Sequence, residues 1–460
     1  MENKNLWEVY DETQLKELEE VNAGYRKFLD AGKTERECVV ESVKQAKAAG
    51  YLDLQDVIAQ GRTLQAGDKV YAVGMNKTII LFQIGTEPME NGMNILGAHI
   101  DSPRMDLKQN PVYEDTGLAY FDTHYYGGIK KYQWVTIPLA IHGVVAKKDG
   151  TVQDIIIGED ESDPVFVVTD LLIHLSHKRM EKKATEVVEG EALDILVGSK
   201  PLKGEEKDAV KAGILKLIKD KYGMEEEDFQ SAELEIVPAG KARECGLDSS
   251  MILAYGQDDR VCAYTSLIAM LAAKDVKRTA CCVLVDKEEI GSVGATGMHS
   301  KFFENTVAEI INLVGDYSEL ILRRCMTNSK MISSDVGAAY DPMYSEVYDK
   351  KSSSKMGYGL VIKKHTGSRG KSGSNDANAE YIAKLRKIFD DNKVAFQMTE
   401  MGKIDAGGGG TIAYILAQFG MEVIDGGVAV LNMHAPWEVA SKADVYEATR
   451  AYAAFLKDAY

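Results

Sequence analysis

The sequence predicts an α/β protein in which a separate module interrupts one larger domain. After residue 240, apolar strand-like runs alternate with helix-like segments, whereas residues 112–237 combine aromatic and β-branched runs with a Lys/Glu-rich stretch. A chain of 460 residues also exceeds the roughly 100–200 residues typical of one domain. We therefore expect one discontinuous domain, residues 1–111 and 238–460, and an insertion, residues 112–237.

The part before the insertion begins with helices and continues with strands. Apolar residues recur at helical spacing over residues 11–32 and 34–51, and Gly50 is placed as a helix stop. Residues 68–83 alternate as a hairpin that turns near residues 75–77, and residues 93–100 form the next expected strand.

The part after the insertion alternates between the two element types. We expect a helix over residues 259–274 and a strand over 279–286, whose continuous apolar run suits a sheet buried on both faces. A helix at 300–305 and a strand at 308–316 follow in the prediction. Residues 375–398 and 405–430 repeat the alternation of helix and strand.

Composition excludes several classes of partner. The net charge of −17 repels a phosphate backbone, so nucleic acid is not an expected partner. The N-terminus lacks the apolar core of a signal peptide, and no run reaches the ~20 apolar residues of a membrane helix. The six cysteines show no CxxC spacing, which favours reduced core thiols. These features predict a cytoplasmic protein without a membrane partner.

The stretch ILGAHIDSPRMDLKQNP, residues 95–111, places two polar side chains where an apolar strand stops. In extended backbone, residues i and i+2 point the same way, so His99 and Asp101 can face one cavity. The ordinary alternative is a histidine with a polar neighbour in a turn. The rest of the chain must decide between these two interpretations.

Four further stretches carry polar, metal-competent side chains at expected strand ends or helix starts. They are YGQDDRVCAY, VLVDKEEIGS, MISSDVGAAYDP and VLNMHAPWE, with candidate residues Asp258, Glu288, Glu289, Asp335 and His434. Taken singly, each has an ordinary alternative: a helix N-cap, a solvated acidic turn, a turn aspartate or a core histidine. In open α/β sheets, however, ligands bind outside the carboxyl ends of strands, where distant parts of a chain can meet.

Together these residues suit a hydrolytic metal centre. Two imidazoles and three carboxylates form the mixed nitrogen and oxygen ligand set of a two-metal site, whose ions lie ~3.5–4 Å apart. Adjacent side chains diverge, so one of Glu288 and Glu289 can bind a cation while the other takes a proton from water.

The motifs HIDSP, QDDR, VDKEEIGS, ISSDVG and NMHAPWE, in this order, resemble those of the M18 family of metallo-aminopeptidases, the family of aspartyl aminopeptidase. The resemblance covers residues 15–455 and is closer to the bacterial branch. It implies a two-part α/β peptidase domain with a mixed sheet between helices, plus an inserted β-rich dimerisation domain. It also implies short peptide substrates and a homo-oligomer, a tetrahedral dodecamer built from dimers.

The resemblance implies a role for each motif residue. Two divalent metal ions are expected, zinc by default and cobalt or manganese as alternatives. One ion would be held by His99 and Asp335, the other by Glu289 and His434, and both by a bridging Asp258. Asp101 would accept a hydrogen bond from the His99 ring, and Glu288 would be the general base.

Four further residues are weaker candidates for substrate binding. GLVIKKH resembles the segment that presents a substrate-binding lysine, here Lys363, although a strand-edge lysine is an equal alternative. DAGGGGTIA resembles a loop lining the substrate pocket, with Gly409 and Gly410, against the alternative of a flexible loop. Asp170 stands where eukaryotic relatives have a histidine-bearing segment, and an acid there would disfavour acidic substrates.

Two other functions remain open at this point. A related amidohydrolase or deacylase could use the same site on another amide. A non-catalytic assembly or cargo protein could be built on the same fold, because fold does not determine function. Neither GxSxG nor HExxH occurs in the sequence, which argues against a serine nucleophile and a thermolysin-like zinc enzyme.

Overall fold

The computed structural model describes residues 4–460 and divides the chain into two compact units. Of the described residues, the first unit comprises 4–101, 242–433 and 438–460, and the second comprises 102–241 and 434–437. The sequence-based division places the limits at 111/112 and 237/238. The two units are described separately below.

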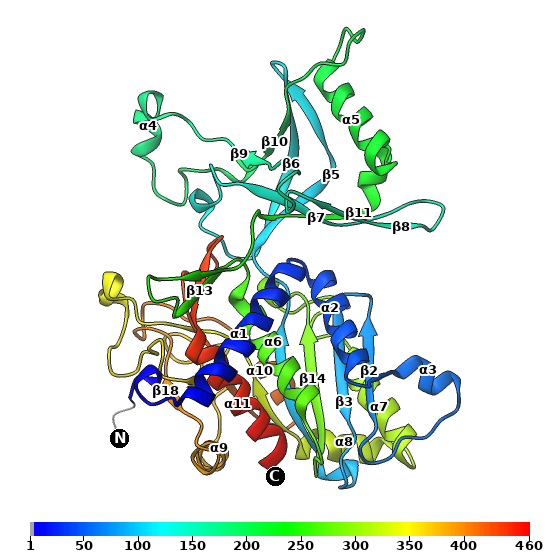
Figure 1. Ribbon diagram of the computed structural model, residues 1–460, viewed down its shortest axis with the longest axis vertical. Coiled ribbons are helices and arrows are strands. Elements are labelled where there is room, and N and C mark those ends of the chain that lie inside the picture. Colours follow the sequence, from blue (N-terminus) through cyan, green and yellow to red (C-terminus); the bar gives the residue numbers. More distant parts are fainter. Residues whose placement is uncertain (1–3) are drawn as a thin grey trace. The chain divides into compact units, whose positions relative to one another are not determined.

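A mixed nine-stranded sheet organises the first unit (Figure 1). Its strands, in spatial order, are β1 (Leu52–Asp53), β2 (Lys69–Gly74), β3 (Thr78–Gln83), β14 (Thr279–Val285), β4 (Met93–His99), β15 (Lys330–Ser333), β19 (Glu422–Gly427), β17 (Leu360–Lys363) and β18 (Phe396–Thr399). The four central strands β14, β4, β15 and β19 run parallel, so their carboxyl ends meet at one edge of the sheet.

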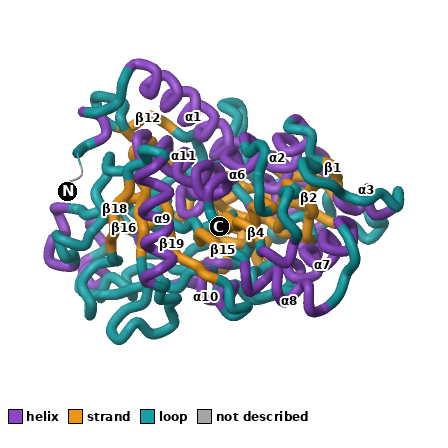
Figure 2. The backbone as a smooth tube through the Cα atoms, turned by 90° about the horizontal axis from the view of Figure 1, so that it is seen from below, coloured by secondary structure: helices purple, strands orange, loops and turns teal. Residues whose placement is uncertain are grey.

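Helices cover both faces of this sheet (Figure 2). One face carries α1 (Glu12–Ala31), α2 (Glu35–Ala48), α6 (Gln257–Ala272), α9 (Ala379–Asp391) and α11 (Lys442–Asp458). The other face carries α3 (Leu54–Ala59), α7 (Phe302–Val314), α8 (Glu319–Asn328) and α10 (Ala413–Ala417). The expected α/β class and the mixed sheet between helices are confirmed.

Strand periodicity explains why the sheet is buried on both faces. Cys282 belongs to the apolar core on one face, and its neighbour Cys281 belongs to the core on the other. Successive side chains of a strand point to opposite faces, so the continuous apolar run of β14 fills both cores.

One expected element is wrong. Residues 308–316 were expected to form a strand but lie mostly in α7. The buried residues Phe303, Val307, Ile310 and Ile311 recur at helical spacing. A short apolar run does not distinguish a strand from a helix by itself, and here the buried positions continue the helical spacing that begins at Phe303.

Two more sheets complete the description. A five-stranded sheet in the first unit contains β12 (Arg243–Cys245), β13 (Met251–Ala254), β21 (Glu438–Ser441), β20 (Ala429–Leu431) and β16 (Gly337–Ala338). The second unit is built on an antiparallel sheet ordered β8 (Val152–Ile157), β7 (Leu139–Ala146), β11 (Ala232–Pro238), β5 (Arg104–Asp115), β6 (Leu118–Tyr126), β10 (Ile195–Gly198) and β9 (Val167–Val168). Its helices are α4 (His177–Met180) and α5 (Ala209–Tyr222).

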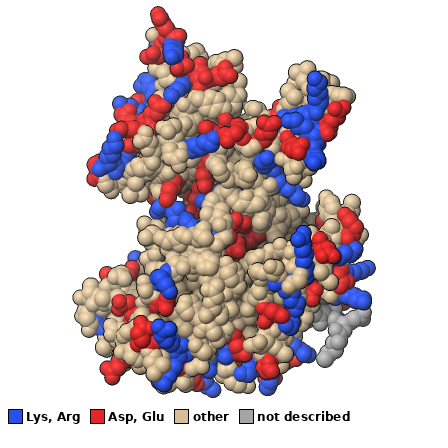
Figure 3. All heavy atoms as spheres, turned by 180° about the vertical axis from the view of Figure 1, so that it is seen from behind, with Lys and Arg blue, Asp and Glu red and all other residues tan. Residues whose placement is uncertain are grey.

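Acidic and basic side chains are interspersed on the face drawn in Figure 3. Within residues 4–460, no helix is both long enough and apolar enough to cross a bilayer.

Candidate metal centre

The candidate site lies at the carboxyl edge of the parallel strands. His99 is the last residue of β4, and Asp335 follows β15 by two residues. Glu288 and Glu289 lie in a single 3₁₀ turn after β14, the segment Glu288–Ile290. Gly291 has a φ of 95°, a conformation open to glycine, and ends this turn directly after the two acids.

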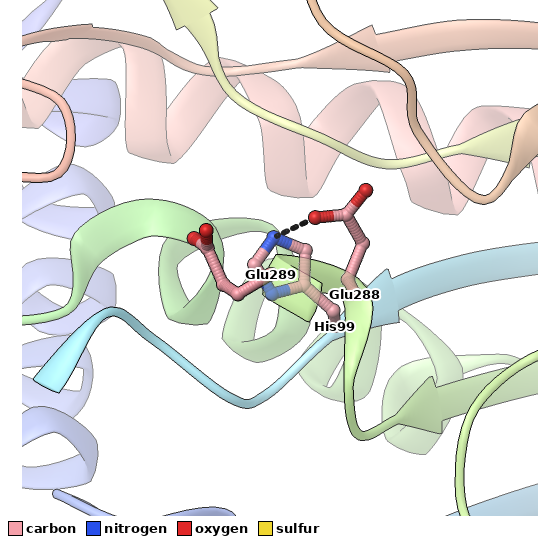
Figure 4. Close-up of side chains that lie close together, drawn as sticks. All are labelled: His99, Glu288 and Glu289. Carbon is pink, nitrogen blue, oxygen red and sulfur yellow. Dashed lines mark ion pairs between the residues drawn. The ribbon is translucent and has the colours of Figure 1, made fainter. Parts of the chain in front are cut away.

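The two glutamates flank the imidazole of His99 (Figure 4). The Glu288 carboxylate points toward His99 Nε2 at 3.9 Å, and the Glu289 side chain extends on the other side of the ring. His99 Nε2 also lies 3.2 Å from Oδ1 of Asp258. The expected divergence of the adjacent glutamates is therefore seen at the ring.

Asp101 contacts both the ring and the turn that carries the glutamates. His99 Nδ1 lies 3.0 Å from the Asp101 carbonyl oxygen and 3.3 Å from its carboxylate. The same carboxylate accepts hydrogen bonds from the backbone amides of Glu288, at 3.1 Å, and Glu289, at 3.2 Å. A single buried side chain thus orients a histidine and an acidic turn from another strand.

Asp258 lies in the first turn of α6, at a kink where its backbone angles are not helical. Its carboxylate lies beside the His99 ring. The Asp258 amide donates to Oε2 of the buried Glu438 at 2.9 Å. Sequence reasoning assigned no role to Glu438, although it lies within the NMHAPWE motif, because a single glutamate that begins a strand carries no distinguishing pattern.

Within the first unit, two sets of three side chains have the spacing of metal ligands. In the first set, His99, Asp258 and Asp335 each offer a ligand atom within 4.8 Å of the others. In the second set, the same holds for His99, Glu288 and Glu289. Imidazole nitrogen and carboxylate oxygens are the donors expected of a zinc site, so the residues fit a divalent ion.

The electrostatics of the cluster also favour a bound cation. Burial raises the pKa of Glu288 to about 8, opposed by His99 and reinforced by Asp335, Asp101 and Asp258. Burial likewise raises the pKa of Asp335 to about 7, while Lys363 and His99 lower it. Burial lowers the pKa of His99, but its hydrogen bonds to Asp101 and Asp258 outweigh burial and raise it well above its usual range. Crowded carboxylates are disfavoured as anions unless a cation lies among them.

The remaining predicted residues lie in different surroundings. His434 belongs to the second unit, where its Nδ1 is 2.8 Å from the Gly128 carbonyl oxygen, and its role as a ligand stays a prediction. Asp170, also in the second unit, pairs with Arg179 at 2.6 Å, so its charge has a local partner. Lys363 is 1% exposed.

The glycine-rich segment makes its close contact at a residue that was not singled out. Neither Gly409 nor Gly410 is tightly packed, because a Cβ there would meet nothing closer than 3.8 Å. At Gly408 a Cβ would lie 2.6 Å from the backbone nitrogen of Ser368. Gly408 is therefore the position where the backbones of two loops require glycine.

A mixed sheet between helices, with histidine and carboxylates clustered at the carboxyl ends of its strands, is an arrangement that suits a metal-dependent hydrolase. The family profile described as "Aminopeptidase I zinc metalloprotease (M18)" matches residues 28–456, so the chain belongs to the M18 family. Members of this family are zinc-dependent aminopeptidases.

Individual relatives are similar to this chain over nearly its full length. A protein of Clostridium acetobutylicum, described as "Probable M18 family aminopeptidase 1", is 61% identical over 458 residues, which cover 99% of this chain and 98% of the relative. The crystal structure of an M18 aminopeptidase from Thermotoga maritima has 44% identity and a TM-score of 0.94, with 99% of each chain covered. The structure of the S. cerevisiae mApe1 dodecamer has 21% identity and a TM-score of 0.78 over 95% of this chain and 96% of that one, so it shares the fold alone.

Proposed function

We propose that this chain is a two-metal aminopeptidase that removes N-terminal residues from short peptides by attack of an activated water. The observation that carries the proposal is the convergence of His99, Asp258 and Asp335, from three separate segments, with ligand atoms within 4.8 Å. Membership of a zinc metalloprotease family supports zinc as the metal.

The proposed ligand set follows the motif residues. His99 and Asp335 would hold one ion, Glu289 and His434 the other, and the carboxylate of Asp258 would bridge them. The 3.2 Å approach of Asp258 to His99 supports a shared ion for this pair. A bridging carboxylate offsets the repulsion between two neighbouring cations.

The proposed chemistry divides the work between the ions and the protein. The ions, when bound, would act as Lewis acids that lower the pKa of a water molecule and polarise the peptide carbonyl. Glu288 would take the proton from the attacking water and deliver it to the leaving amine. Asp101 would keep Glu288 in reach, because its carboxylate accepts the Glu288 amide hydrogen bond.

Hydrolysis of a panel of aminoacyl p-nitroanilides tests this function. The purified protein would be stripped with a chelator and reloaded separately with zinc, cobalt and manganese. We expect release only after reloading, and the panel then ranks the N-terminal side chains. A panel of N-acyl amino acids run in parallel separates the nearest alternative, because cleavage of these compounds alone would identify a deacylase. No cleavage in either panel at full metal loading would favour a non-catalytic role.

We further propose that the second unit mediates dimerisation and that the dimers assemble into a tetrahedral dodecamer. The support is the motif resemblance together with the shared fold of the yeast protein that is solved as a dodecamer. Light scattering on the purified protein at several concentrations would measure the mass. A mass that stays at 50.6 kDa would contradict the proposal.

A further inference from the structure

Lys363 has an unusual environment for a lysine. It is the last residue of β17, its side chain is 1% exposed, and lysine is almost never fully buried without partners. Its Nζ donates to the carbonyl oxygens of Val336, at 2.8 Å, and Asp335, at 3.3 Å. Its end group therefore contacts the backbone of the segment that carries a proposed metal ligand.

Strand β19 contacts both Lys363 and the segment that its ammonium binds. Lys363 is paired across the β17–β19 ladder with Asp425, whose carboxylate accepts a hydrogen bond from Thr411 Oγ1 at 2.5 Å. At the end of strand β19, a Cβ on Gly427 would lie 2.2 Å from the Asp335 carbonyl oxygen, so the two backbones are in close approach. The Asp335 carbonyl oxygen therefore accepts from the Lys363 ammonium and is also in close approach to the Gly427 backbone.

We propose that Lys363 is a positioning residue, whose buried ammonium holds the Asp335–Val336 backbone so that the Asp335 carboxylate stays in place for a metal ion. This inference rests on the proposed function, because it takes Asp335 as a ligand. It differs from the substrate-binding role suggested by the sequence, in which the ammonium would face the peptide.

Removal of the ammonium has two opposing effects on metal affinity. Without this positive charge, the carboxylates attract a cation more strongly. At the same time, two buried carbonyl oxygens lose their donor, and the segment that carries the ligand loosens. Affinity alone therefore does not distinguish the roles. Coordination geometry does, because it responds to the position of the Asp335 carboxylate and not to the net charge around it.

The test uses Co²⁺ as the probe, since its visible absorption depends on coordination geometry. Spectra of the cobalt-loaded protein would be compared for the wild type, Lys363→Met and the matched control Lys364→Met. Lys364 is the next residue, has a partly exposed side chain and pairs with Asp376, so its loss leaves the Asp335–Val336 segment in place. We expect a changed band shape for Lys363→Met and an unchanged spectrum for Lys364→Met.

Kinetics provide the second readout. A positioning role predicts a kcat loss of about 10–100-fold for neutral and acidic aminoacyl substrates alike, the effect typical of residues that orient metal ligands. A substrate-binding role predicts instead a KM increase confined to acidic substrates, with an unchanged cobalt spectrum. That second pattern would overturn the inference.

Two further variants keep the outcome decisive. Asp335→Ala must itself change the cobalt spectrum; if it does not, Asp335 is not a ligand and the proposed site fails together with this inference. If Asp335→Ala changes the spectrum and Lys363→Met does not, only this inference fails. Should Lys363→Met not fold, Lys363→Gln keeps a polar end group at the buried position, and a wild-type cobalt spectrum with wild-type kcat for that variant would contradict the positioning role.

Discussion

The carboxylate of Asp101 lies 3.1 Å from the backbone nitrogen of Glu288 and accepts its hydrogen bond. Asp101 is fully buried, and its other oxygen accepts the amide of Glu289. The link joins the segment after β4 to the turn after β14, so the residue that orients His99 also holds the proposed base.

Asp101→Asn should reduce kcat by about 10–100-fold with little change in KM. The amide can present only one oxygen, so one of the two backbone donors loses its acceptor and the turn shifts. Steady-state kinetics on an aminoacyl p-nitroanilide would measure this. Asp115→Asn, at an exposed position of β5, is the matched control. Wild-type kcat for Asp101→Asn would show that the hydrogen bonds do not position the turn.

Glu288→Gln should retain its metal and lose most of its turnover. The base is removed while the proposed ligands stay, and general base catalysis typically contributes about 10²–10⁴-fold. Metal content by elemental analysis and kcat under the same conditions check both halves of the expectation. Near-normal turnover in this variant would mean that another group takes the proton.

Asp258→Ala should lower the metal content of the purified protein. Without the proposed bridging carboxylate, repulsion between the two ions is no longer offset. Elemental analysis after dialysis against a fixed zinc concentration would measure the occupancy. Asp68→Ala, at a surface carboxylate paired with Arg62, is the control. Full occupancy in Asp258→Ala would exclude the bridging role.

Asp444→Asn should change the pH dependence of stability. Burial raises the pKa of Asp444 to about 7, although hydrogen bonds from the backbone amides of Gly357 and Gly359 lower it. The folded state then binds a proton more tightly than the unfolded state, whose aspartate pKa is about 3.9. The wild type therefore loses stability from this group as pH rises from about 4 to about 7, and the variant does not.

The measurement is the difference in unfolding temperature between Asp444→Asn and wild type across that pH range. We expect the unfolding temperature of the variant to increase relative to that of the wild type as pH rises. Asp390→Asn, on the exposed side of α9, should show a difference that is independent of pH. A flat difference for Asp444→Asn as well would mean that the Asp444 carboxylate is already ionised throughout the range.

Local sequence patterns predicted much of the fold, and their one clear error has a local cause. The strand at β14 was evident because its apolar run is too continuous for a surface strand, and the hairpin of β2 and β3 because its alternation breaks near residue 75. The apolar run in α7 was assigned to a strand because a short, nearly continuous apolar run does not by itself distinguish a buried strand from a helix.

The candidate site was only partly visible in the same way. Each motif could be found because a polar residue interrupts an apolar strand, as His99 does at the end of β4. Glu438 and Gly408 could not be found in this way, because the local sequence does not distinguish a glutamate or a glycine whose partner lies on another segment. Lys363 was noticed for its motif, but its burial was not apparent.

By itself the sequence determined the class of fold, the order of the elements and the residue types available for a metal, since these depend on periodicity and on short segments. Only the tertiary structure decided that Asp101 contacts two glutamate amides and that Lys363 points at the backbone beside Asp335. Those contacts join residues separated by 187, 188 and 28 positions. They exist because strands β4, β14, β15 and β17 share one sheet, and strand pairing across a sheet cannot be read from local periodicity.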